Sequence, residues 1–344
     1  MGSIREREEM ERRAWARGMW EIMKESVSQK LLTWHLPSPP FLLPGQLSGL
    51  TVIVTGATSG IGLHTARELV MAGAHVVMAC RNIEVANCMA HEWRAQASDG
   101  MIGEMEAIPI DLLSLSSVLS FALEWEKRAK PLHVLVNNAG AFYMKEPQRF
   151  TEGGIKQHMQ VNHIAPALLI LLLLPSLLKA PSSRIVNVNS VAHHCAVVDP
   201  SHWTSRIEDD KFNDIRAYGE SKLAQLMFLK TLARKLSEKK ITSIQCIAVS
   251  PGIVNTKLVK QVPISDWKLF WMFSPAEGAR SVVFCATSAR TVDKAKGFAY
   301  YSYACKPTKE SPQAMDVDLC LHVWQKTLEI LHLDVDYLNQ VINC

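Results

Sequence analysis

The sequence has 344 residues, of which 48% are hydrophobic and 20% charged, and its formal net charge is +4. These proportions exclude a disordered or collagen-like chain, because they supply enough apolar residues for one sizeable buried core. The net charge is too small for this length to indicate a nucleic-acid partner, which usually shows as a clustered basic face.

Cysteine usage and the first residues indicate a reducing environment. The eight cysteines form no CxxC pair and most lie in apolar surroundings, as buried free thiols do. The opening residues, MGSIREREEMERR, are densely charged and lack the apolar stretch of a secretory signal. We therefore expect a protein that is cytoplasmic or peripherally associated with an intracellular membrane, and not secreted.

Residues 1–36 form a segment of their own. It could dock on a membrane surface, on a partner or on the rest of the chain, and the sequence leaves these three alternatives open. Its mixed charges make the membrane surface the weakest of the three. Residues 37–49 contain four prolines, which fix φ and remove N–H donors, so we expect an extended linker there. Apolar residues at helical spacing predict an amphipathic helix in the first segment, at Trp15, Met19, Ile22, Met23, Val27, Leu31 and Trp34.

Residues 50–335 read as one domain of alternating strands and helices. The strands are continuously apolar, which is typical of a parallel sheet covered on both faces. The sequence therefore predicts an α/β fold, a Rossmann-type doubly wound parallel sheet in three α/β/α layers. The expected strands are 51–55, 75–79, 105–110, 132–136, 185–189 and 244–249, and the expected helices are 61–72, 83–97, 114–129, 155–178 and 217–238.

The longest apolar run, residues 164–178, is shorter than the roughly 18–20 residues that a membrane span needs. Pro166 and Pro175 interrupt it. We expect it to be a buried helix.

A glycine-rich turn joins the first strand to the first helix of the domain. Glycines let backbone amides approach a pyrophosphate closely, and the N-terminus of a helix favours an anion. The spacing is GxxxGxG, and the strand–turn–helix context is the one that a dinucleotide site requires. The candidate cofactor residues here are Thr55, Gly56, Ser59, Gly60, Ile61 and Gly62.

The ends of the second and third strands add cofactor candidates. Arg81 follows the second strand, where an acidic residue would hold a ribose 2′-hydroxyl, and a guanidinium there can pair with a 2′-phosphate. This favours NADP(H) over NAD(H), against the alternative of a solvated arginine. Asp111 and Leu112 end the third strand where an adenine ring should lie, although Asp111 could equally be a helix N-cap.

Further motifs follow in a fixed order: NNAG at 137–140, QVNH at 160–163, VNVNS at 186–190, YGESK at 218–222 and PGIVNT at 251–256. With TGATSGIG at 55–62 they resemble the short-chain dehydrogenase/reductase family over about residues 50–300. Within it they resemble the retinol-dehydrogenase-like and WW-domain-oxidoreductase-like branch. The resemblance implies that cofactor contacts also come from Asn138, Ala139, Gly140, Tyr218, Lys222, Pro251, Gly252, Val254 and Thr256.

Four residues form the candidate catalytic set. Tyr218 and Lys222 share one face of a helix, and an ammonium should lower the tyrosine pKa from about 10 toward the range of an efficient acid–base catalyst. Ser190 ends the fifth strand, where its hydroxyl can bind a substrate oxygen. The resemblance implies that Asn162 holds a water for proton exchange with Lys222; the alternative is an amide that satisfies local backbone.

The segment between Ser190 and Tyr218 is longer than the family's common spacing, so we expect it to reshape the rim of the pocket; the resemblance implies that longer spacing is usual in the retinol-dehydrogenase-like branch. His193 and His194 lie at the pocket edge and have no ligand-like partners, so we expect no metal site. Residues 258–274 should form a lid on the substrate side. Its apolar residues could receive a lipophilic substrate, touch a membrane or pack on the domain.

We therefore expect an NADP-dependent oxidoreductase that transfers a hydride between nicotinamide and a small-molecule alcohol or carbonyl substrate, for which a lipophilic compound is one candidate. The alternative is a weakly active or inactive nicotinamide-binding regulatory protein of the same fold. The resemblance also leaves open a homodimer through the helices that carry residues 164–178 and Tyr218.

Overall fold

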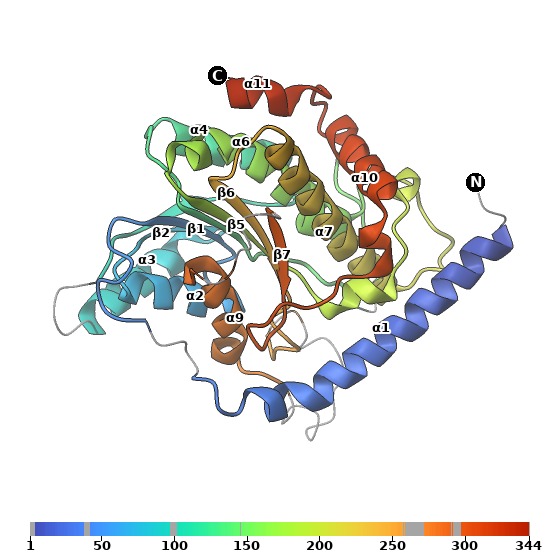
Figure 1. Ribbon diagram of the computed structural model, residues 1–344, viewed down its shortest axis with the longest axis horizontal. Helices are drawn as coiled ribbons and strands as arrows, with labels where there is room; N and C mark the ends of the chain where they lie inside the picture. The colour runs from blue at the N-terminus through green and yellow to red at the C-terminus, as the bar shows by residue number, and fades with distance from the viewer. Residues whose placement is uncertain are drawn as a thin grey trace.

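Seven parallel strands form one sheet at the centre of the computed structural model, in the order β3-β2-β1-β4-β5-β6-β7 (Figure 1). The structure describes residues 4–37, 42–96, 102–144, 146–256, 258, 272–289, 291 and 297–343. The strands are β1 (Thr51–Thr55), β2 (His75–Cys80), β3 (Met105–Pro109), β4 (Val134–Asn137), β5 (Ser183–Val188), β6 (Ile244–Val249) and β7 (Phe298–Tyr301). The predicted doubly wound parallel sheet is confirmed.

The sheet is buried on both faces, which explains why its strands lack polar alternation. In β1, Ile53 belongs to one apolar cluster, whereas Val52 and Val54 belong to the cluster on the other side. Six strands lie within two residues of their predicted limits. The sequence reading missed β7, a four-residue strand at the sheet edge that follows Gly297.

Helices cover both faces of the sheet and complete the three layers. Helices α2 and α9 pack together on one face with α3, and α4, α6 and α7 cover the other (Figure 1). The helices are α1 (Ile4–Thr33), α2 (Gly60–Met71), α3 (Ile83–Gln96), α4 (Leu115–Glu126), α5 (Gln157–Met159), α6 (Ala165–Lys179), α7 (Asp214–Glu238), α9 (Pro275–Thr287), α10 (Val317–Ile330) and α11 (Tyr337–Asn343).

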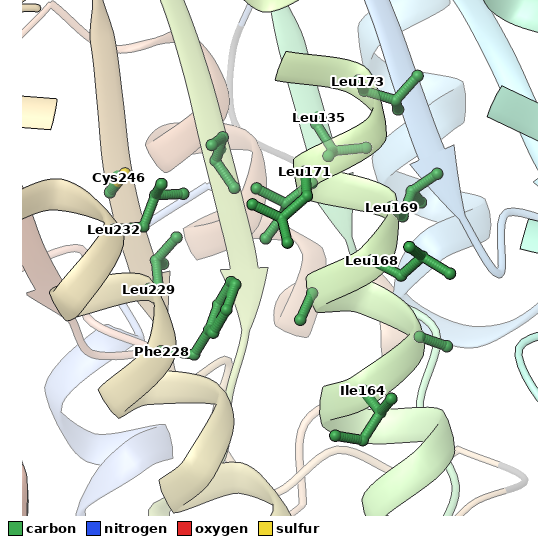
Figure 2. Packing of buried hydrophobic residues seen from close by; sticks show 14 of the residues in the cluster. Leu135, Ile164, Leu168, Leu169, Leu171, Leu173, Phe228, Leu229, Leu232 and Cys246 are labelled. Carbon is green, nitrogen blue, oxygen red and sulfur yellow. The ribbon is translucent and has the colours of Figure 1, made fainter. Parts of the chain in front are cut away.

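The apolar run at 164–178 forms α6 inside the core, as predicted. Its leucines pack between β4 and α7, where Leu135 and Phe228 meet them (Figure 2). Among the described residues, the stretch Gln157–Lys179 is the one helix long and apolar enough to cross a membrane, and 83% of its most apolar window is buried. Burial of this extent is that of a core helix.

The C-terminal helices cover the outer sides of α7 and α6 (Figure 1). Trp324 of α10 stacks on Phe228 of α7 with ring centroids 4.7 Å apart. The Thr327 hydroxyl lies 2.8 Å from Nε2 of His163, which precedes α6. Leu338 of α11, which lies beyond residue 335, is buried in the same apolar cluster. The chain thus buries the surfaces of α6 and α7 against its own C-terminal segment.

The described part of the Pro-rich segment is a series of turns. The amides of Gln46 and Ser48 donate to the carbonyls of Leu43 and Gly45, and Leu47 is buried against the body. The expectation of an extended linker is therefore wrong for residues 42–49. Gly45 has a φ of +75°, so one glycine lets the chain turn back on itself where prolines alone indicated extension.

Candidate active site

A cavity of about 710 Å³ opens at the carboxyl ends of the central strands. This is the edge at which open α/β sheets bind ligands. Most of the predicted site residues line it: Gly56, Ser59, Gly60, Ile61, Arg81, Asp111, Leu112, Asn138, Ala139, Gly140, Ser190, Tyr218, Lys222, Pro251, Gly252, Val254 and Thr256. Thr55, Gly62 and Asn162 lie outside the lining.

The glycine-rich turn forms one wall of the cavity. Gly56 and Gly60 have φ values of +66° and +55°, which favour glycine. The Ser59 side chain makes no capping hydrogen bond, so it does not occupy the backbone amides that begin α2. A Cβ on Gly60 would lie 3.2 Å from Thr256 across the cavity. This wall is a compact backbone cradle of the kind that a pyrophosphate fits.

Thr55 and Gly62 support the cradle from behind. The Thr55 hydroxyl accepts hydrogen bonds from the amides of Asn138 and Ala139, each at 3.0 Å. Asn138 Nδ2 donates to the Thr55 carbonyl at 2.9 Å, which locks the NNAG turn to the glycine-rich turn. A Cβ on Gly62 would lie 2.3 Å from Asn138 Nδ2 and 2.4 Å from the Gly56 carbonyl oxygen, so only glycine fits there.

The ends of β2 and β3 line the same cavity. Arg81 follows β2 directly, and its side chain is exposed. Asp111 accepts a hydrogen bond from the Leu113 amide at 3.0 Å. The N-cap of α4 is Ser114, which accepts from the Ser117 amide. The N-cap alternative for Asp111 is therefore wrong, and its carboxylate lies beside the cavity.

Tyr218 lies buried beside Ser190. Burial raises the pKa of the Tyr218 hydroxyl to about 12, and the hydrogen bond with the Ser190 side chain acts in the opposite direction. The expected lowering of the tyrosine pKa is therefore not found, because desolvation outweighs the polar neighbours. Ser190 also accepts a hydrogen bond from the Ala192 amide at 3.2 Å, which orients its hydroxyl.

Lys222 is buried one helical turn after Tyr218. Its Nζ donates to the Val188 carbonyl at 2.9 Å and lies 5.9 Å from the centre of the Tyr218 ring. Burial lowers the pKa of the Lys222 ammonium to about 7. Two buried groups thus lie close together: Tyr218, a proton donor, and Lys222, which can lose its charge near neutral pH.

Asn162 holds the turn beneath the cavity. It lies in a π-helical segment, Gln160–Ile164, and its side chain accepts from the Ala141 amide at 2.8 Å. The same side chain donates to the Ala141 carbonyl and to the Ser221 hydroxyl, each at 2.9 Å. Its backbone carbonyl accepts from Gln225 Nε2 at 2.8 Å. The side-chain partners lie 21 and 59 positions away, so the amide joins the turn after the NNAG motif to α7 and does not satisfy local backbone; the expected role in holding a water stays a prediction.

The long segment after Ser190 packs against the body. His193 Nδ1 lies 2.7 Å from the Ser190 carbonyl, and its Nε2 accepts from the Ser311 amide at 3.1 Å. Both ring nitrogens of His193 are therefore engaged with the backbone of other residues. Trp203 is fully buried, and its indole donates to Glu220 at 3.2 Å. Ile215, which precedes Tyr218, returns to the cavity as part of its rim.

The sequence reading missed an apolar group at the substrate end of the cavity. Phe142 follows the NNAG turn, and its ring centroid lies 4.8 Å from that of Tyr218. Ile22 of α1 also lines the cavity. The phenylalanine could have been inferred from the motif before it, whereas Ile22 is 196 positions before Tyr218 and no local pattern places it there. The further apolar residues are Tyr143, Met144, Val191, Ala192, Ile215 and Leu258.

The expected lid falls mostly outside the described residues, including Trp267, Leu269, Phe270 and Trp271. At its end, Met272 and Phe273 are buried. The Phe273 amide donates to the Ile253 carbonyl at 2.9 Å. This part of the segment packs on its own domain.

Comparisons with known proteins agree with this geometry. A sequence model of the family described as short chain dehydrogenase matches residues 50–266. The chain is 41% identical over 342 residues to dehydrogenase/reductase SDR family member FEY of Arabidopsis thaliana, covering 95% of this chain and 90% of that protein. It is 34% identical to retinol dehydrogenase 11 of Homo sapiens, covering 85% of this chain and 88% of that protein.

Solved structures show the same fold. A protein from Mycobacterium paratuberculosis superposes with a TM-score of 0.65 at 27% identity, covering 83% of this chain and 95% of that one. NADPH-bound carbonyl reductase from chicken fatty liver gives a TM-score of 0.57 at 24% identity, covering 77% of this chain and all of that one (100%).

The sheet, the glycine-rich cradle and the match over residues 50–266 define a dinucleotide-binding oxidoreductase. The chain belongs to the short chain dehydrogenase family and is an NAD(P)-dependent oxidoreductase acting on the CH–OH group of its substrates.

Proposed function

We propose that this protein is an NADP-dependent oxidoreductase that interconverts a lipophilic alcohol and its carbonyl compound. The observation that carries the proposal is the group of buried Tyr218 and Lys222 with half-buried Ser190, at the edge of a cavity that continues to the glycine-rich cradle. One end of the cavity is backbone and polar, and the other is apolar. A dinucleotide fits the first end, and a lipophilic substrate fits the second.

The chemistry assigned to the protein is proton transfer and orientation. A bound nicotinamide would supply the hydride or accept it. In the reductive direction, the Tyr218 hydroxyl donates its proton to the substrate oxygen, and the Ser190 hydroxyl donates a hydrogen bond to the same oxygen. Lys222 supplies positive charge beside the tyrosinate that remains, and Asn162 keeps the Gly140–Ala141 turn in place.

With a pKa of about 12, Tyr218 needs an interaction that stabilises its anion. A hydroxyl with so high a pKa is a weak acid, and its anion is a strong base. Positive charge placed near the ring stabilises the anion and lowers that pKa. We therefore assign to Lys222 the role of matching Tyr218 to the carbinol, with the charged form of Lys222 as the active one.

Cofactor residues are proposed from the walls of the cavity. The amides of Gly60 and Ile61 at the start of α2 would hold the pyrophosphate, and Asp111 with Leu112 would flank the adenine. Arg81 would pair with the 2′-phosphate, because a guanidinium matches phosphate geometry and because the two residues directly after β2, Arg81 and Asn82, are not acidic. This favours NADP(H) over NAD(H).

The outer face of α1 supports a peripheral membrane contact. The helix buries one side against the domain, while several large apolar side chains on its other side are exposed. Such a face is typical of helices that lie in a membrane interface. The exposed large apolar residues of α1 are Met10, Met19, Trp20, Met23, Val27, Leu31 and Leu32, and Trp34 follows just after the helix ends.

We infer that a homodimer through α6 and α7 is disfavoured. Helices α10 and α11 already cover those helices, with Trp324 stacked on Phe228. A dimer of that kind would first have to displace the C-terminal segment. We therefore propose that any self-association uses another surface.

The experiment that tests the proposed function is a pair of measurements on the full chain. Fluorescence titration with NADPH and with NADH should show tighter binding of NADPH. A panel of aldehydes and ketones of increasing apolar length should then show NADPH oxidation. Absence of binding of either dinucleotide would contradict the proposal, and binding without turnover of any carbonyl or alcohol would favour the regulatory alternative.

A further inference from the structure

Helix α1 lies along one side of the domain (Figure 1) and contacts the turn that follows Ser190. Its Ile22 lines the cavity. Gly18 packs so closely on Cys195 that a Cβ there would lie 2.2 Å from the sulfur. Further along the helix, the Ser28 and Tyr303 hydroxyls lie 2.8 Å apart, and Lys30 forms an ion pair with Glu277 at 2.8 Å. The helix is therefore fixed to the domain at both ends of the stretch that passes the cavity.

Gln29 of α1 forms a two-point contact with the backbone of the cavity wall. Its Oε1 accepts from the Ile253 amide at 2.8 Å, and its Nε2 donates to the Ile253 carbonyl at 3.0 Å. The Gln29 side chain is fully buried, at 0% exposure. Two hydrogen bonds from one rigid side-chain amide fix the backbone of Ile253 on both sides of its Cα, and so fix the two successive peptide units of the loop.

The wall that Gln29 holds is the Pro251–Val254 loop, which lines the cavity after β6. Gly252 has a φ of +91°, and a Cβ there would lie 2.8 Å from Gln29 Oε1. The glycine therefore permits both the turn and the approach of the glutamine. The loop lines the same cavity as Ser190 and Tyr218, and under the proposed function the nicotinamide has to lie beside the substrate oxygen that these two residues bind, so the position of the loop affects that half of the cofactor.

Ile22 lies almost two turns before Gln29 and lines the same cavity. Its neighbour Met23 is 52% exposed on the outer face of the helix. The helix thus presents Ile22 to the cavity and Gln29 to the loop beside it. Both residues precede residue 50, where the match to the short chain dehydrogenase family begins.

We propose that α1 is part of the active site of this enzyme. Gln29 is a positioning residue that holds the Pro251–Val254 loop in the form that accepts the nicotinamide half of the cofactor. Ile22 is a specificity-determining residue that contacts the apolar part of the substrate. The inference rests on the proposed function for the identity of the ligands, and on the contacts of α1 for the residues.

The test of Gln29 compares four variants of the full chain, two at Gln29 and two control variants. Gln29→Met keeps the volume and removes both hydrogen bonds, whereas Ser28→Ala removes the contact with Tyr303 and Lys30→Gln removes the ion pair with Glu277, and both controls keep the hydrogen bonds between Gln29 and Ile253. Gln29→Met should weaken NADPH binding about tenfold, or about 1.4 kcal/mol, and raise KM for NADPH more than it lowers kcat. Gln29→Glu, which keeps an acceptor for the Ile253 amide, should restore part of the affinity.

A second readout needs no cofactor. Hydrogen exchange of the peptide that contains Ile253 should be faster in Gln29→Met than in the wild type, Ser28→Ala or Lys30→Gln, because its amide loses its acceptor. If Gln29→Met matches the two control variants in both NADPH affinity and exchange, the glutamine only helps to dock the helix and the inference is wrong.

The test of Ile22 uses substrate size. Ile22→Ala should improve kcat/KM for bulkier carbonyl compounds over small ones, and Ile22→Trp should do the reverse, with NADPH affinity changed less than twofold. Met23→Ala on the outer face should change neither. An unaltered substrate ranking in both Ile22 variants would overturn the assignment. Failure of the wild type to bind NADPH would instead contradict the proposed function.

Discussion

Lys222 Nζ donates to the Val188 carbonyl at 2.9 Å and lies 5.9 Å from the centre of the Tyr218 ring. One buried ammonium therefore links the end of β5 to the helix that carries the tyrosine. Its position also explains its titration, because burial lowers the pKa of Lys222 to about 7 while that of Tyr218 rises to about 12. Both titratable groups are buried, so their protonation states depend on the charges that lie near them.

The Lys222 pKa predicts a pH dependence of stability. Its folded-state pKa, about 7, lies below its ordinary value of 10.5, so the unfolded chain binds more protons between these values. The contribution of Lys222 to the free energy of unfolding should therefore rise with pH from about 7 toward 10.5, by at most about 1.4 kcal/mol per pH unit. Thermal unfolding of Lys222→Met and the wild type across this range should show the wild type gaining relative to the variant. Parallel curves would contradict the prediction.

Glu25 of α1 predicts the opposite dependence at lower pH. It is buried beside Ser250, with Oγ to Oε1 at 3.5 Å, and burial raises its pKa from 4.5 to about 8. Stability from Glu25 is thus fully present below pH 4.5 and is lost as the pH rises through 8. Glu21 and Lys24 on the same helix, and Tyr300 from β7, are the other titratable groups that act with it.

The variant that tests this is Glu25→Gln, which cannot ionise. It should match the wild type near pH 4.5 and become progressively more stable than it toward pH 8, with exposed Glu9→Gln as the control. Chemical denaturation at several pH values gives the free energies of unfolding. A difference between Glu25→Gln and the wild type that does not change with pH would show that the carboxyl titrates in its ordinary range.

Arg81 predicts cofactor choice. Arg81→Glu should weaken NADPH binding by about 10- to 100-fold, as expected for the loss of a charge-assisted phosphate contact, and should spare or improve NADH binding. Lys127→Glu makes the same change in charge at an exposed site just after α4 and serves as the control. Fluorescence titration measures the affinity of each variant for NADPH and for NADH. An unchanged preference in Arg81→Glu would refute the 2′-phosphate role.

Trp324 predicts the effect of the C-terminal cover. Trp324→Ala should lower the free energy of unfolding by roughly 3–5 kcal/mol, because it removes a buried indole stacked on Phe228. Chemical denaturation of the variant and the wild type measures this difference.

The C-terminal helices also bear on self-association. Since α10 and α11 occupy the outer sides of α7 and α6, we expect no dimer through these two helices in sedimentation of the wild type. A stable wild-type dimer that exchanges slowly and buries α7 would contradict this arrangement.

The sequence predicted the parts of the structure that depend on local pattern. Continuous apolar strands and GxxxGxG gave the sheet and its nucleotide edge, and Tyr218 with Lys222 followed from helical spacing. The roles of Ile22 and Gln29 could not be predicted, because no periodicity encodes which surface an amphipathic helix covers. Ile253, which Gln29 contacts, lies 224 positions along the chain. The tyrosine pKa went the other way from the expected one because desolvation depends on three-dimensional burial.

The central claim is that the Tyr218 hydroxyl exchanges the proton with the substrate oxygen. The most direct measurement is the single-turnover rate of NADPH oxidation by Tyr218→Phe with a carbonyl substrate of the wild type, beside Tyr143→Phe, which removes a hydroxyl from the same cavity. We predict that Tyr218→Phe loses about 10²- to 10⁴-fold in rate and keeps its NADPH affinity, whereas Tyr143→Phe changes the rate by less than about tenfold. A Tyr218→Phe protein that turns over at the wild-type rate would contradict the mechanism.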